Sequence, residues 1–155
     1  MAAVVTVERE IAAPAQRIFD LLADPRRHAE IDGSGSVGTV AEGTPARLSQ
    51  GAGFGMSMKQ MGMRYKTANT VSEFEEGRRI AWHHKANVTW RYELEPTPGG
   101  TRVRETWDPT TGSKVGGVFF SILRFGPRNE KAMRATLDRL AAVVEQPGGP
   151  CASTT

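Results

Sequence analysis

The chain opens with apolar and polar residues at alternating positions. Within residues 4–11, the apolar side chains of Val5, Val7 and Ile11 are separated mainly by polar ones. A period of two is typical of a strand that buries one face and leaves the other in water. The segment therefore predicts a half-buried first strand.

The period changes after Pro14, a residue that suits the first turn of a helix. Residues 16–23 place four apolar side chains on one helical face: Ile18, Phe19, Leu21 and Leu22. Asp24 and Pro25 follow and end this helix, and Asp24 is a suitable N-cap for a second short helix over residues 26–31. We therefore expect two short helices after the first strand.

Residues 37–108 return to short extended segments, separated by turns at 42–45, 75–78 and 96–100. Regular spacing with short turns predicts an antiparallel meander. The predicted strands cover residues 46–51, 54–61, 63–74, 79–85, 89–95 and 101–107.

Beyond Pro109 the apolar residues recur at helical steps, with charged residues between them. The most regular of them are Met133, Leu137, Leu140 and Val144, and an earlier set is Val118, Phe119, Ile122 and Leu123. The spacing predicts a long amphipathic C-terminal helix, with a bend at Pro127. We expect the helix to end before Pro147 and residues 147–155 to be a disordered tail.

These elements predict one α+β domain over residues 1–146. A meander of about seven strands curves, and a long amphipathic helix has to bury its apolar face. The compact arrangement is a curved antiparallel sheet of about seven strands, with two short helices after the first strand and the C-terminal helix packed on the sheet.

Four segments of the chain have a recognisable pattern: residues 7–25, 78–82 (Arg-Arg-Ile-Ala-Trp), 99–108 (Gly-Gly-Thr-Arg-Val-Arg-Glu-Thr-Trp-Asp) and 128–140. They resemble the START-like, or SRPBCC, superfamily of Bet v 1-like proteins, and its polyketide cyclase/dehydrase group in particular. The resemblance covers about residues 4–144 and implies the helix-grip fold, in which sheet and last helix enclose a deep apolar cavity. The superfamily includes lipid carriers, aromatase/cyclases and suspected toxins, so the resemblance implies no single activity.

Composition and charge narrow the function classes. Hydrophobic residues make up 39% of the chain and charged residues 24%, as in an ordinary globular domain. The net charge is only +3 and basic residues alternate with acidic ones, so we expect no nucleic-acid partner. The longest apolar run, residues 115–123, is too short to span a membrane, and we expect no stable membrane insertion. Cys151 is the only cysteine, which favours a cytoplasmic location.

Strand alternation sorts the aromatic residues by face. Ile80, Trp82 and His84 share one face of their strand, whereas His83 lies on the other. The same alternation in neighbouring strands, together with the C-terminal region, gives a candidate ligand-binding wall: Phe54, Met56, Met58, Tyr65, Asn69, Val71, Trp82, His84, Trp90, Tyr92, Glu105, Trp107, Phe119, Met133 and Leu137. Apolar walls with a few polar groups are typical of small-molecule pockets.

Three functions are compatible with this wall. The first is binding of a hydrophobic small molecule, such as a polyketide or lipid. The second is polyketide cyclisation or dehydration, in which His84 or Glu105 acts as the base and Tyr92 or Tyr65 as a proton donor. Tryptophans around Glu105 would raise its pKa. The third is an ordinary closed core in a protein-interaction or toxin-like module that has no ligand and an unknown protein partner.

The histidines do not predict a metal site. His83 and His84 lie on opposite faces of one strand, and His28 belongs to a helix distant in sequence. No ligand spacing of the zinc or iron type is present. We therefore expect neither a metal nor a cofactor.

Overall fold

The structure is a computed structural model that describes residues 3–84, 88–111 and 125–146. The predicted helical face through Phe119, the predicted tail and the end of the predicted strand 79–85 lie outside these residues. The elements are β1 (Val5–Ile11), α1 (Ala15–Leu22), η1 (Pro25–Arg27), α2 (His28–Ile31), β2 (Val37–Val40), β3 (Gly53–Gln60), β4 (Met63–Glu75), β5 (Arg79–His84), β6 (Thr89–Thr97), β7 (Gly100–Asp108) and α4 (Phe125–Val144).

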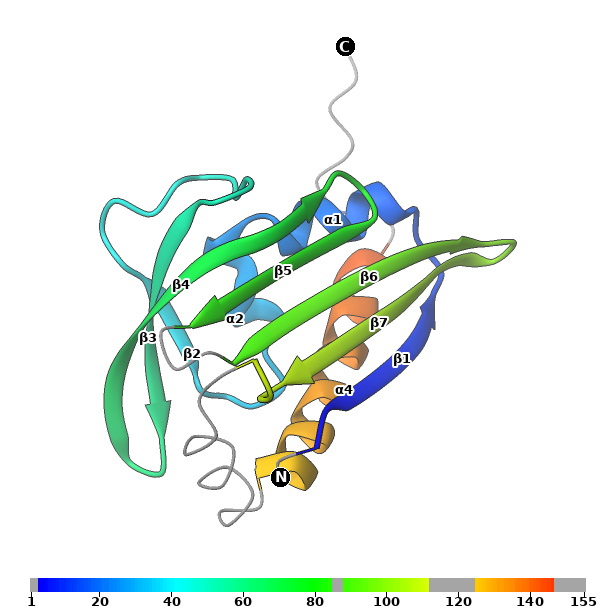
Figure 1. The fold of residues 1–155 in the computed structure, drawn as a ribbon. Helices are drawn as coiled ribbons and strands as arrows, with labels where there is room; N and C mark the ends of the chain where they lie inside the picture. The colour runs from blue at the N-terminus through cyan, green and yellow to red at the C-terminus, as the bar shows by residue number, and fades with distance from the viewer. Residues whose placement is uncertain (1–2, 85–87, 112–124, 147–155) are drawn as a thin grey trace.

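The strands form one seven-stranded antiparallel sheet in the order β1-β7-β6-β5-β4-β3-β2. Figure 1 shows the helices on one side of this curved sheet, with α4 running behind β7 and β1. The first strand therefore pairs with the last one, and the others follow as a meander. The predicted α+β helix-grip architecture is confirmed.

The short helices form where the sequence predicts them. All four apolar residues of the α1 face are buried. The Asp24 carboxylate accepts a hydrogen bond from the Arg26 backbone N–H at 3.0 Å, so Asp24 caps η1 as expected. These helices cover one end of the sheet and position α2 against the concave face.

The predicted strand over residues 46–51 is wrong. The structure forms β2 at Val37–Val40 instead, and residues 46–51 belong to the connection to β3. Leu48 is buried, and its backbone N–H bonds the Ala23 carbonyl oxygen at 2.7 Å rather than a neighbouring strand. Gly51 has φ of +78°, a left-handed conformation that ends any extended segment.

Helix α4 buries the stripe that its periodicity predicts. Met133, Leu137, Leu140 and Val144 are each at most 3% exposed. The described part of the helix begins at Phe125, so the bend expected at Pro127 falls in the first turn, where proline removes no helical hydrogen bond. Earlier residues of the predicted helix lie outside the described part of the chain.

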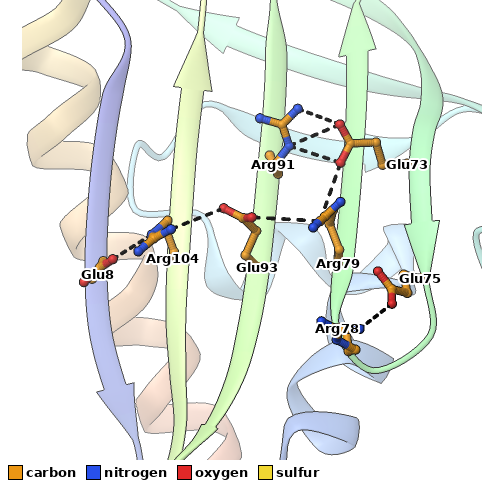
Figure 2. Close-up of polar contacts among 8 residues, drawn as sticks. All are labelled: Glu8, Glu73, Glu75, Arg78, Arg79, Arg91, Glu93 and Arg104. Carbon is orange, nitrogen blue, oxygen red and sulfur yellow. Dashed lines mark hydrogen bonds and ion pairs between the residues drawn. The ribbon is translucent and has the colours of Figure 1, made fainter.

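The opposite, solvent-facing side of the sheet is covered by arginines and glutamates. Figure 2 shows a chain of ion pairs that crosses from β1 to β4, through Glu8, Arg104, Glu93, Arg79, Glu73 and Arg91. The shortest contacts are Glu8–Arg104 and Glu73–Arg91, both 2.6 Å. This face pairs its charges within the sheet.

Candidate ligand-binding site

A cavity of about 230 Å³ lies between the concave face of the sheet and helices α2 and α4. All three tryptophans of the chain line it. Strand pairing explains why they gather, because Trp82 lies opposite Trp90 and Trp90 lies opposite Trp107. The three side chains form one row across β5, β6 and β7.

Most of the predicted wall residues line this cavity. They are Phe54, Met56, Met58, Tyr65, Asn69, Trp82, His84, Trp90, Tyr92, Glu105, Trp107 and Met133. Their roles toward a ligand remain predictions, because no bound molecule is present. The strand faces that alternation predicts to point inward are the faces that line the cavity.

Val71 and Leu137 lie elsewhere, which corrects their predicted place on the wall. Both are 1% exposed and belong to the packed core. Val71 precedes a register shift between β4 and β5, beyond which the two strands continue to pair in a different register. Leu137 lies one helical turn beyond the wall residue Met133. Phe119 lies outside the described residues.

His28 is a wall residue that sequence reasoning did not identify. Its ring stacks on Trp82, with 5.1 Å between centroids and 20° between planes, and Phe54 meets both rings edge-on. The Nε2–H of His28 donates to the Leu22 carbonyl oxygen at 2.8 Å. Burial lowers the pKa of His28, so the ring is neutral at physiological pH. The available signal was its i,i+3 spacing to the apolar Ile31, which places both residues on the buried face of α2.

Glu105 is the most unusual polar group of the cavity. Its side chain is 2% exposed, and Oε1 accepts a hydrogen bond from the Tyr92 hydroxyl at 2.8 Å. Oε2 is buried and has no hydrogen-bond partner among the described residues. Tyr92 and Glu105 are direct cross-strand neighbours, so the sheet itself fixes their contact.

The environment of Glu105 favours the protonated acid. Burial is the main cause that raises its pKa, to about 8, and the negative charge of Asp32 adds to the effect. The hydrogen bond from Tyr92 acts in the opposite direction but does not offset burial. The raised pKa predicted from the surrounding tryptophans is therefore confirmed in direction.

Asp32, a residue that the sequence analysis did not identify, also lines the cavity. One carboxylate oxygen accepts hydrogen bonds from the Ser34 backbone N–H and hydroxyl at 3.0 and 2.7 Å, and the other accepts one from the Val37 N–H at 3.0 Å. Asp32 therefore organises the connection from α2 to β2 while its charge acts on Glu105.

The three predicted catalytic residues do not meet at one point. Tyr92 lies opposite Ile80 of β5, whereas His84 lies four residues further along that strand, or about 13 Å. His84 instead pairs in register with Asn69, and burial lowers its pKa, with the neighbouring His83 as a smaller cause. Tyr92 and Glu105 form one polar pair, and His84 belongs to a separate part of the wall.

Among residues 3–84, 88–111 and 125–146, no three His, Cys, Asp or Glu side chains cluster in a way that would hold a metal ion. None of the helices in that part of the chain has the length and apolar content needed to cross a membrane.

Comparison with known proteins identifies the family. The chain belongs to the family described as polyketide cyclase / dehydrase and lipid transport, which matches residues 2–145. This match and the structural similarities confirm the resemblance to the SRPBCC superfamily. The family name covers both catalysis and transport, so it leaves the activity and the ligand open.

A curated relative is the uncharacterised protein Rv0088 of Mycobacterium tuberculosis, which is 37% identical over 136 residues. The match covers 85% of this chain, and the chain spans about 60% of the length of the curated relatives it matches.

Solved structures share the fold at low identity. Protein CV1439 of Chromobacterium violaceum has a TM-score of 0.72 and 19% identity, covering 94% of this chain and 99% of that one. The AHSA1-like protein of Aeromonas hydrophila has a TM-score of 0.68 and 18% identity, covering 99% of each chain. These similarities support the fold alone.

Proposed function

We propose that this domain binds a hydrophobic small molecule, such as a polyketide or lipid, in the cavity between the sheet and α4. The observation that carries the proposal is an aromatic cavity lined by the buried carboxyl of Glu105, whose Oε2 has no hydrogen-bond partner within the described residues. Protein interiors are close-packed, and a void of roughly 150 Å³ already suffices for benzene. A cavity of about 230 Å³ therefore argues against the alternative of a closed core.

The experiment is an NMR titration that follows the three tryptophan indole N–H signals, one for each tryptophan of the wall. The probes are dodecanoic acid, cholesterol and 1,8-dihydroxyanthraquinone. Saturable shifts with at least one probe would support the proposal. Absence of saturable shifts with all three would contradict it for lipids and aromatic polyketides.

A matched pair of variants locates the binding. Ala132 lines the cavity from α4, so Ala132→Phe should fill it and abolish the shifts. Ala142 is exposed on the same helix, and Ala142→Phe should leave binding unchanged. Equal binding by both variants would place the probe outside the cavity.

A second candidate function is acid–base catalysis on a polyketide, favoured by the contact between Tyr92 and a Glu105 carboxyl with a pKa of about 8. A group that titrates near neutral pH transfers protons efficiently in both directions. Turnover of a poly-β-ketone probe should be lost in Glu105→Gln while binding is retained. Turnover that survives this substitution would remove Glu105 from the mechanism.

The cytoplasmic location and the absence of a nucleic-acid partner stay predictions from the sequence.

A further inference from the structure

We propose that the cavity selects uncharged ligands that place a carbonyl, or another hydrogen-bond acceptor, against Oε2 of Glu105. This inference deepens the proposed function and rests on it. It adds the chemical class of the ligand and the atom that recognises it, neither of which follows from an apolar cavity alone.

The geometry of the sheet places Glu105 at the cavity. Glu105 lies on β7 between Val7 of β1 and Tyr92 of β6, so the sheet holds its side chain on the concave face. Tyr92 donates to Oε1, which leaves Oε2 as the oxygen without a partner in the described residues. Buried polar atoms in folded proteins nearly always have a hydrogen-bond partner, and leaving one without a partner is destabilising. A ligand atom in the cavity is a natural partner for Oε2.

The charge of the cavity wall disfavours an anionic ligand. The titratable groups that line the cavity are Glu105, Tyr92, Tyr65, Asp32, His28 and His84. Among the described lining residues there is no lysine or arginine, and burial lowers the pKa of both histidines. An anionic ligand would therefore lack a positive partner and would meet the negative charge of Asp32. Burying an unpaired charge is strongly unfavourable.

The direction of the hydrogen bond from Tyr92 determines which oxygen of Glu105 carries the acid proton. An apolar site keeps a carboxylic acid neutral, and a neutral acid donates a hydrogen bond. Because Tyr92 already donates to Oε1, the acid proton belongs on Oε2, which is the oxygen left for a ligand. The raised pKa of Glu105 supports this protonation state at neutral pH. A carbonyl oxygen accepts such a proton, whereas a hydrocarbon does not.

A cationic ligand is the competing possibility. Trp82, Trp90 and Trp107 could surround an ammonium group, and an ionised Glu105 could pair with it. The two possibilities differ in the pH dependence of binding. A ligand that accepts from the acid binds better below the pKa of Glu105, whereas an ammonium binds better above it.

The test uses four naphthalene probes of similar size: 2-acetylnaphthalene, 2-ethylnaphthalene, 2-naphthoate and 2-naphthylmethylammonium. Dissociation constants come from the tryptophan indole N–H signals at pH 6.5. We expect the ketone to bind about 10-fold more tightly than each other probe, since a hydrogen bond to a buried, otherwise unpaired group is worth roughly that factor. Above pH 8, its affinity should fall toward that of 2-ethylnaphthalene as Glu105 loses its proton.

Variants of Glu105 separate hydrogen bonding from packing. In Glu105→Gln the amide N–H also donates, so the ketone should still bind and the pH dependence should disappear. In Glu105→Leu the donor is lost, and the ketone should bind no better than 2-ethylnaphthalene. Arg104→Gln, on the opposite face of β7, is the control and should match the unsubstituted protein.

The outcomes distinguish the two proposals. Equal binding of the ketone and the hydrocarbon would overturn this inference while the proposed function stands. Tightest binding of the naphthoate or the ammonium would overturn it as well, and would assign a charged ligand instead. Failure of all four probes to bind would contradict the proposed function, and this inference with it.

Discussion

Two adjacent rows of residues cross the same three strands and have opposite chemistry. On the outer face, Arg79, Glu93 and Arg104 lie side by side in β5, β6 and β7. The neighbouring set of paired positions lies on the inner face and consists of Ile80, Tyr92 and Glu105. Each row contains one glutamate, yet the two glutamates have very different surroundings.

The outer glutamate lies between two arginines. Glu93 is 3.9 Å from both Arg79 and Arg104, at the surface of the sheet (Figure 2). Within the described part of the chain, the inner glutamate, Glu105, has the Tyr92 phenol as its side-chain hydrogen-bond partner and no cation beside it. The charges of the outer row are paired within the protein. The inner row contains one polar atom, Oε2 of Glu105, that has no hydrogen-bond partner in the described residues. The comparison shows which of many acidic residues is a candidate for function.

The largest expected difference between the rows is in stability. Ile80 is fully buried, so Ile80→Ala should lower the free energy of unfolding by about 2–5 kcal/mol. Arg79→Ala, the adjacent outer residue, should cost less than about 1 kcal/mol because exposed ion pairs contribute little. Urea denaturation of both variants measures the difference. Equal losses would show that the outer ladder carries as much stability as the core.

The next effect is the pH dependence that Glu105 imposes. Its folded-state pKa, about 8, exceeds the ordinary value of 4.5, so folding takes up a proton between these values and stability falls as pH rises through them. Glu105→Gln removes this dependence. The stability of the variant relative to the unsubstituted protein should therefore rise by up to about 1.4 kcal/mol per pH unit from about pH 5 to 8, then level off.

An outer glutamate supplies the control for this experiment, with the opposite sign. Hydrogen bonds from Arg91 lower the pKa of Glu73, so its contribution to stability is present above the ordinary pKa and is lost as pH falls through the lowered one. The deficit of Glu73→Gln should therefore shrink in acid. Urea denaturation at a series of pH values measures both variants, and profiles of the same sign would contradict the contrast between the faces.

A smaller effect is expected from the partner of Glu105. Tyr92→Phe removes the hydrogen bond to Oε1 and should cost about 1–2 kcal/mol, because it leaves a second buried carboxyl oxygen unpaired. This hydrogen bond lowers the pKa of Glu105, so the pKa should rise further in the variant. Carboxyl ¹³C chemical shifts followed through a pH titration report the change. A fall in the pKa would contradict the assigned direction.

The smallest effect is expected within the outer ladder. Arg91→Met removes the nearer of the two arginine partners of Glu73 and keeps most of the aliphatic stem, and it should cost at most about 1 kcal/mol. The cost should decrease in 1 M salt, which screens surface charges. Thermal unfolding at low and high salt measures it. A cost that is insensitive to salt would indicate that packing, and not charge, holds this residue.

The sequence predicts the faces of the sheet better than its connections. Alternation within strands identified Trp82, Trp90 and Glu105 as inward residues, because a strand's period is independent of what packs on it. The false strand at 46–51 arose because Leu48 is buried by contact with the α1 region, and such a contact leaves no periodic trace.

The site residues that the sequence analysis did not identify depend on contacts between distant segments. His28 joins the wall because α2 packs over β5, and Asp32 acts on Glu105 through space. The pattern of the sequence also indicated that Glu105 would be buried, but whether Oε2 has a partner depends on the size of the cavity and on every neighbour of that atom. Such facts follow only from the three-dimensional arrangement.

The pairing of β1 with β7 has a consequence for how the protein folds. Thr6 and Thr106 contact each other across these strands, although they are 100 residues apart in the chain. Contacts between remote segments form slowly, since a long loop has to close first. During synthesis β1 emerges early and lacks its partner until β7 has followed. The strand that carries Glu105, β7, is itself a member of this late-closing pair, so the cavity should be among the last parts of the molecule to form.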